Sequence, residues 1–148
     1  MKERSPNRAV SLCLLGVIVS LVLVGGVSHT PIRHLIQVTP ACLIAALAWR
    51  GVAWSRAAAL PVFLLWLFLM TLIWLYLLGI VAVIRGTFSP AEILLTMTIG
   101  LSALAGIVFL FRWRENARWS SRALSFLVSS VFQIGALWLS FQPAFANR

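Results

Sequence analysis

Negative charge is scarce in this sequence. It contains no aspartate, and its 3 acidic residues are Glu3, Glu92 and Glu115. Charged residues of either sign make up 10% of the 148 residues, against about 25% in an average soluble domain. So few charges could not cover the surface of a soluble fold. The shortage of charge therefore excludes an ordinary soluble domain.

Cysteine and histidine are scarce as well, with 2 residues of each. Cys13 and Cys42 lie inside apolar runs and form no C-x-x-C motif, which is typical of small packing residues. The chain has no serine, histidine and carboxylate set, no glycine-rich phosphate loop and no H-E-x-x-H motif. We therefore expect no metal site and no cofactor, and an enzyme is less favoured than a protein without catalytic activity. We also expect no nucleic acid partner, because no long segment outside the apolar runs could form a domain that binds one.

Long apolar runs are what the sequence does contain, with 61% hydrophobic residues and a mean hydropathy of +1.00. The charge-free runs cover residues 9–27, 57–84, 93–111 and 123–147. Each run reaches the roughly 20 residues that span a bilayer as a helix. The sequence therefore predicts an all-α integral membrane protein, with one transmembrane domain over residues 1–148 and no soluble domain.

About five transmembrane helices fit this pattern. We expect them at residues 9–28, 35–49, 57–84, 91–111 and 123–141. The second is expected to be short and kinked by Pro40, and it spans only if Arg33 and His34 reach the headgroups at its outer end. The third is longer than a bilayer requires, so we expect it to tilt or protrude.

The placement of lysine and arginine predicts how the chain crosses the membrane, because cytoplasmic loops carry an excess of these residues. With a cytoplasmic N terminus, the inner segments hold most of the 12, namely Lys2, Arg4, Arg8, Arg50, Arg56, Arg112, Arg114, Arg118 and Arg122. The outer segments hold Arg33, Arg85 and Arg148. We therefore predict an N-in, C-out protein of a bacterial inner membrane.

The segment "SPAE", residues 89–92, contains the acid nearest to the membrane. Ser89 and Glu92 have the spacing of a capping box, in which each side chain bonds the backbone N–H of the other residue. Pro90 suits the first turn of a helix. We interpret Ser89 and Glu92 as a helix cap, with a proton relay at Glu92 as the alternative.

The segment "GGVSHTPIRHLIQVTP", residues 25–40, holds both histidines. We interpret it as a polar turn with interfacial anchors. A pH-sensitive or substrate-contacting outer loop is a second hypothesis, since histidine titrates near neutral pH. Ligation of a metal or haem would need His29 and His34 to converge across Pro31, and no further ligand lies near them in the sequence.

Small and polar residues form stripes at helical spacing. Such stripes let helices approach closely, and hydroxyl or amide groups across them contribute about 0.6 to 2 kcal/mol each. The residues are Gly16 and Ser20; Thr96, Gly100, Ser102, Ala103 and Gly106; and Ser125, Ser129, Gln133, Ala136 and Ser140. Internal packing or an oligomer contact is the main interpretation. The alternative is a polar path or small-molecule pocket that involves Gln37 and Gln133.

The segment "RWRENARWSSR", residues 112–122, is the most strongly charged part of the chain. If it is helical, Arg114, Arg118 and Arg122 stack at four-residue steps, which favours contact with anionic headgroups. The expected lipid contacts on the inner face are Arg112, Arg114, Arg118 and Arg122 with the anchors Trp113 and Trp119. The alternative is an acidic patch on a partner protein.

These patterns favour an accessory or interaction subunit of a larger membrane assembly, because packing stripes are present and convergent chemistry is not. Its partners would be other membrane helices, from a different chain or from further copies of this one. The first alternative is a self-associating transporter or channel for a small solute. The second is an enzyme that acts on a lipid-linked substrate at the outer leaflet, using Glu92, His29 or His34 with Arg33 or Arg85 on a phosphate.

Overall fold

The computed structural model describes residues 4–82, 87–112 and 117–146. Within these ranges the chain forms helices and connecting turns, and five helices are long and apolar enough to span a membrane. They are α1 (Arg4–Val27), α2 (Pro31–Trp49), α3 (Ser55–Leu77), α4 (Pro90–Arg112) and α5 (Trp119–Ser140), followed by the short α6 (Pro143–Ala146). The predicted all-helical class is confirmed, and the five apolar helices indicate a multi-pass integral membrane protein.

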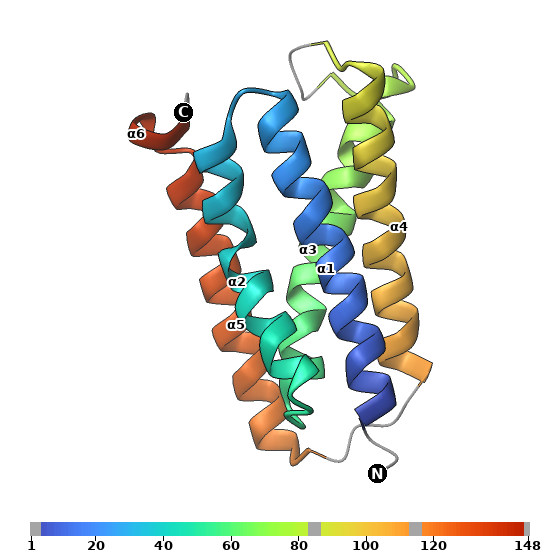
Figure 1. Ribbon diagram of the computed structural model, residues 1–148, viewed down its shortest axis with the longest axis vertical. Helices are drawn as coiled ribbons and strands as arrows, with labels where there is room; N and C mark the ends of the chain where they lie inside the picture. Colours follow the sequence, from blue (N-terminus) through green and yellow to red (C-terminus); the bar gives the residue numbers. More distant parts are fainter. Residues whose placement is uncertain (1–3, 83–86, 113–116, 147–148) are drawn as a thin grey trace.

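The five long helices run roughly side by side and form an up-and-down bundle (Figure 1). α3 packs against all four other long helices, whereas α4 packs on α1 and α3, and α5 packs on α2 and α3. The start of α1, the α2–α3 connection, the end of α4 and the start of α5 lie at one end, which we call the N-terminal end. The α1–α2 connection, the end of α3, the start of α4 and the short α6 lie at the opposite end (Figure 1).

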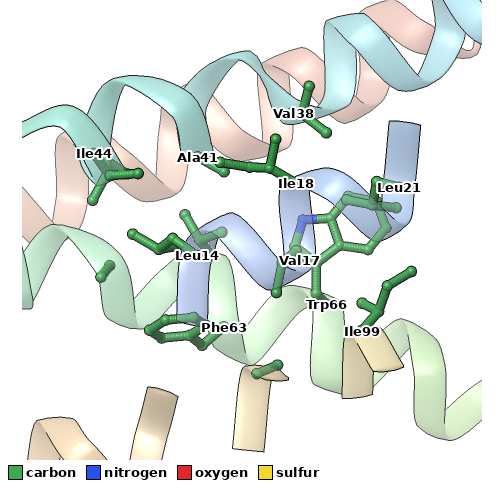
Figure 2. Packing of buried hydrophobic residues seen from close by; sticks show 14 of the residues in the cluster. Leu14, Val17, Ile18, Leu21, Val38, Ala41, Ile44, Phe63, Trp66 and Ile99 are labelled. Carbon is green, nitrogen blue, oxygen red and sulfur yellow. The ribbon is translucent and has the colours of Figure 1, made fainter. Parts of the chain in front are cut away.

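An apolar core fills the space between α1, α2, α3 and α4 (Figure 2). Leu14 and Phe63 are fully buried, and Trp66 is 3% exposed. Van der Waals packing has to hold these helices together, because a bilayer supplies no hydrophobic driving force between them. The described residues of α5 contribute nothing to this apolar core.

Glycines allow close contacts between α4 and its neighbours. A Cβ added at Gly100 would fall on the indole ring of Trp74, and one added at Gly106 would fall on the ring of Phe63. A Cβ at Gly16 of α1 would lie 2.6 Å from the hydroxyl oxygen of Ser102. The stripes predicted on these helices therefore serve packing inside the bundle.

α5 is attached by polar contacts instead. The hydroxyl of Ser129 donates to the carbonyl of Ala58 at 2.6 Å. At the opposite end of the bundle, the Gln37 amide donates to the hydroxyl of Ser140 at 2.9 Å. The stripe predicted on this helix therefore faces α2 and α3, and hydrogen bonds hold α5 where the apolar core does not reach.

α3 ends earlier than the sequence predicts. Residues 78–82 leave the helix although the apolar run continues through them. Gly79 has φ 73° and donates its N–H to the carbonyl of Tyr76, and the N–H of Ile80 donates to the carbonyl of Leu75. This is a Schellman motif, which favours glycine because it needs a left-handed residue. α3 therefore has 23 residues, and the predicted excess length is wrong.

The other boundaries differ mainly at helix starts. α2 begins at Pro31 rather than at residue 35, because proline is well suited to a first helical position. It remains the shortest span, at 19 residues, but is long enough to cross a bilayer, and Pro40 lies inside it. A kink at Pro40 stays a prediction. α1 begins at Arg4 rather than at residue 9, and α5 begins at Trp119 rather than at residue 123.

Candidate functional site

The turn between α1 and α2 is held by its own polar side chains. The Ser28 hydroxyl donates to the carbonyl of Val24 at 2.7 Å and lies 2.8 Å from the Thr30 hydroxyl. His29 has φ 56°, a left-handed conformation that is uncommon for a residue with a side chain. The strain is compensated by the surrounding hydrogen bonds, so the segment is an ordered polar turn.

His34 belongs to the same local network. Its Nδ1 lies 3.0 Å from the carbonyl oxygen of Thr30 and 3.2 Å from the Thr30 hydroxyl. Gly25 allows its approach to α1, because a Cβ there would lie 2.9 Å from the Cβ of His34. His34 is half-buried and His29 is exposed. No group of three or more histidine, cysteine or acidic residues that could hold a metal ion occurs within the described ranges.

The next two predicted site residues on α2 contact the C-terminal part of the chain. The guanidinium carbon of Arg33 lies 4.0 Å from the centre of the Phe141 ring, a cation–π contact. One turn further into the bundle, Gln37 is 3% exposed and donates to Ser140. These contacts fasten the end of α5 to α2, so both side chains have structural partners.

Ser89 and Glu92 lie at the start of α4. The backbone N–H of Ser89 donates to Oε2 of Glu92 at 2.8 Å, and the N–H of Glu92 donates to the Ser89 hydroxyl at 3.3 Å. The Ser89 hydroxyl also donates to the same carboxylate oxygen at 2.8 Å. These are the reciprocal hydrogen bonds of a capping box.

Gln133 is the most deeply buried amide of the protein's described part. Its side chain is 1% exposed, and neither its amide nitrogen nor its carbonyl oxygen has a hydrogen-bond partner within that part. It faces the same neighbours as Ser129, one turn away on α5. Gln133 therefore lies inside the bundle, where a buried amide without a partner is costly.

A groove of about 770 Å³ opens at the N-terminal end, between α4 and α5 with α3 as its floor. We call it the α3–α4–α5 groove, and its main lining residues are Arg56, Leu60, Phe111, Arg122, Phe126 and Leu127. Two guanidinium groups lie at one end of an otherwise mostly apolar surface. Arg122 also lies 5.8 Å from the ring of Trp119, which lines the groove too.

Of the other residues predicted to contact lipid headgroups, Arg112 and Arg118 lie within the described residues. Arg112 ends α4 as an exposed residue, and Arg118 is the N-cap of α5, with an extended backbone at φ −58° and ψ 144°. Arg118 therefore lies outside the helix that carries Arg122, and the stacking expected for a continuous helix does not extend to it. Trp113, Arg114 and Arg85 lie outside the described residues.

Sequence reasoning missed Arg56 as a site residue. It is only 7% exposed, although it lies in the first turn of α3 beside a connecting segment. Its position at the start of a long apolar run gave no signal of burial. The burial of Arg56 depends on the tertiary packing around the start of α3, which no local pattern specifies.

Comparison with known protein families, curated proteins and solved structures finds no match for this chain.

Proposed function

We propose that the protein is an accessory subunit of a larger membrane assembly and that it binds a partner helix on the exposed face of α5. The observation that carries this proposal is Gly135. It is exposed on α5, and nothing lies within 4 Å of the place where its Cβ would be. Gly16, Gly100 and Gly106 each lie against an internal neighbour. Gly26 and Gly79 also have open space beside them, but Gly26 lies in the last turn of α1 and Gly79 beyond the end of α3, whereas Gly135 lies inside a helix.

A glycine on the surface of a membrane helix makes the helix less stable, but it also allows another helix to pack closely. In a helix it is about 1 kcal/mol less favourable than alanine. In a membrane it lets a second helix come close enough for backbone packing. Since no neighbour within the described protein uses the gap at Gly135, a helix from another chain is the natural occupant.

The surroundings of Gly135 suit such a contact. The side chains around it are apolar and exposed, namely Val131 (72%), Ile134 (60%) and Trp138 (67%). They form an apolar face of α5 in which Gly135 leaves a gap. α5 is also the least covered span, with 22% of its most apolar window buried against 39% for α1, α2 and α3. Lipid alone would cover an apolar helix face that has no gap. A face with a gap at a glycine favours a partner helix, because the two backbones can approach closely there.

The arrangement gives less support to a self-associating transporter. That hypothesis needs His34, Gln37 and Gln133 to line a path between copies. Gln37 and Gln133 are buried within one chain, and His34 is bonded to Thr30. A second copy docking on the outer surface would not reach the two glutamines. Large side chains such as Phe63 and Trp66 fill the centre of the bundle (Figure 2).

We also propose that the N-terminal end faces the cytoplasm, in a bacterial inner membrane. Arginines gather at this end among the described residues, namely Arg8, Arg50, Arg56, Arg112, Arg118 and Arg122. At the opposite end Arg33 lies on Phe141. This asymmetry supports an N-in orientation through the positive-inside rule. The same arginines would contact anionic headgroups of the inner leaflet.

The test of the partner helix is a pair of matched substitutions. Gly135→Leu fills the gap on α5, and Thr98→Leu adds bulk to an exposed position of α4 at a similar distance from the same end. Each variant is expressed at natural level, cross-linked in membranes and purified in mild detergent. We expect the wild type and Thr98→Leu to retain a defined partner polypeptide, and Gly135→Leu to lose it while its helix content stays unchanged. Equal retention by all three proteins would contradict the proposal.

A further inference from the structure

α5 is attached to the bundle less extensively than the other long helices. None of its described residues belongs to the apolar core. Among the described residues it packs on α2 and α3 but not on α1 or α4, and it runs along one edge of the bundle (Figure 1). Ser129 bonds to Ala58 of α3, and Ser140 accepts from Gln37 of α2. The docking of α5 therefore depends on polar contacts and on packing outside the core.

Gln133 lies between these two hydrogen bonds along α5 and weakens the docking. Its side chain is 1% exposed, and neither its amide nitrogen nor its carbonyl oxygen has a partner within the described residues. It lies about two helical turns, or roughly 10 Å, before the end of α5 at Ser140. A buried amide inside a membrane span is costly without a partner. The docked position of α5 thus contains a polar group that it does not satisfy.

Gln133 and Gly135 face opposite ways from α5, because residues two apart in an α-helix are separated by about 200°. Gly135 is exposed and Gln133 is buried. A partner helix at Gly135 therefore cannot reach Gln133 while α5 stays on α2 and α3. Undocking would cost Gln133 no hydrogen bond within the described residues, and it would open this face of α5 to a partner.

We propose that α5 undocks from α2 and α3 when the assembly forms, and that an amide or hydroxyl side chain on a membrane helix of the partner then hydrogen-bonds Gln133. This inference rests on the proposed function and adds the chemistry that the partner supplies. A partner shifts such an equilibrium by binding one state better than the other, and here it would do so through Gln133. The apolar core can remain in place, because the described residues of α5 supply none of it.

Disulfide cross-linking of the full chain in liposomes measures undocking without a partner. In a background without Cys13 and Cys42, single cysteines replace Ala136, Val131 or Val62. Ala136 is 8% exposed on the inner face of α5, Val131 is 72% exposed on its outer face, and Val62 is fully buried in α3. We expect Val131→Cys to form disulfide dimers rapidly, Val62→Cys to form none, and Ala136→Cys to react at a measurable rate through the undocked state.

Two further substitutions should change this rate in opposite directions. Gln133→Leu added to Ala136→Cys should slow dimer formation about threefold or more, because an undocked amide can find polar partners that the docked position does not offer. Ser129→Ala should accelerate it by a similar factor, because it removes the bond to Ala58. A rate for Ala136→Cys as low as that of Val62→Cys, or a rate unaffected by Gln133→Leu, would overturn the proposal.

Retention of the partner polypeptide in mild detergent tests the hydrogen bond at Gln133. The matched control is Gln142→Leu, since the Gln142 amide donates to Trp138 of its own helix at 3.4 Å. We expect the wild type and Gln142→Leu to retain the partner, and Gln133→Leu to retain about tenfold less while its resistance to unfolding stays equal or rises. Misfolding cannot explain a loss of the partner without a loss of stability.

The same comparison separates this inference from the proposed function. Full retention by Gln133→Leu would overturn the hydrogen bond to the partner and leave the contact at Gly135 in place. A wild type that retains no polypeptide would overturn the proposed function and, with it, the pairing of Gln133. The cross-linking rates decide on the undocking of α5 in either case.

Discussion

At the scale of single residues, glycines and rings determine how closely the helices approach. Gly100 and Gly106 lie against the rings of Trp74 and Phe63, so large side chains on α3 fit onto the backbone of α4. This is the membrane form of small-residue packing. The same residue type on α5, at Gly135, has open space in front of it. Replacement of glycine by alanine is therefore expected to have opposite effects on stability at Gly100 and at Gly135.

Gly100→Ala should destabilise the bundle by about 1 to 3 kcal/mol, the usual cost of overpacking, because the new methyl group would fall on Trp74. Gly135→Ala should be neutral or stabilise by up to about 1 kcal/mol, since alanine favours the helix and meets nothing. Unfolding in mild detergent, followed by circular dichroism, measures both. Similar stabilities for the two variants would show that α3 and α4 do not pack as described.

Buried amides provide a second prediction. Gln133 has no hydrogen-bond partner within the described residues, so Gln133→Leu should stabilise the fold by about 1 to 3 kcal/mol. Gln37→Leu should instead cost about 0.6 to 2 kcal/mol, because it removes the bond to Ser140. The same unfolding measurement compares them. A large loss of stability in Gln133→Leu would indicate that this amide has a binding partner. It would favour the alternative hypothesis of a polar path that involves Gln133.

At the scale of helices, α5 differs from the other four because none of its described residues belongs to the apolar core. A hydrogen bond from the Ser11 hydroxyl to the carbonyl of Ala45 also joins α1 to α2, but at α5 such bonds act without the core. Ser129 and Ser130 are adjacent and test this directly. The Ser129 hydroxyl donates across to Ala58 of α3, whereas the Ser130 hydroxyl donates at 2.8 Å to Phe126 of its own helix. Ser129→Ala should cost about 0.6 to 2 kcal/mol, and Ser130→Ala should cost much less.

Hydrogen exchange in detergent localises the effect. We expect Ser129→Ala to increase exchange in residues 119–140 selectively, because α5 would open without disturbing the core of the other helices. Uniform faster exchange over the whole bundle would contradict the separate attachment of α5.

The elements differ in how far the sequence could predict them. The face of α5 was predictable because its serines and Gln133 recur at helical spacing among apolar residues. The end of α3 was not predicted, since its apolar run continues past Gly79, and hydropathy does not register a turn that stays apolar. The Ser89–Glu92 hydrogen bonds follow from local spacing. The burial of Arg56 could not be derived, because it depends on tertiary packing rather than on local spacing.

At the scale of the whole molecule, the bundle has one strongly basic end. Its orientation can be measured with single cysteines in a background without Cys13 and Cys42. Thr87 and Ser120 are exposed at opposite ends. With the N-terminal end in the cytoplasm, Thr87→Cys should react with a membrane-impermeant maleimide in intact cells, and Ser120→Cys should react only after the membrane is opened. The reverse pattern would invert the proposed topology.

We propose that this bundle works as one subunit among others. The most direct test is a native mass spectrum of the protein, expressed at its natural level and released in mild detergent. We predict a mass that contains the 16.3 kDa chain together with at least one different polypeptide. A mass equal to one copy or a whole multiple of the 16.3 kDa chain, with or without lipid, would contradict the claim.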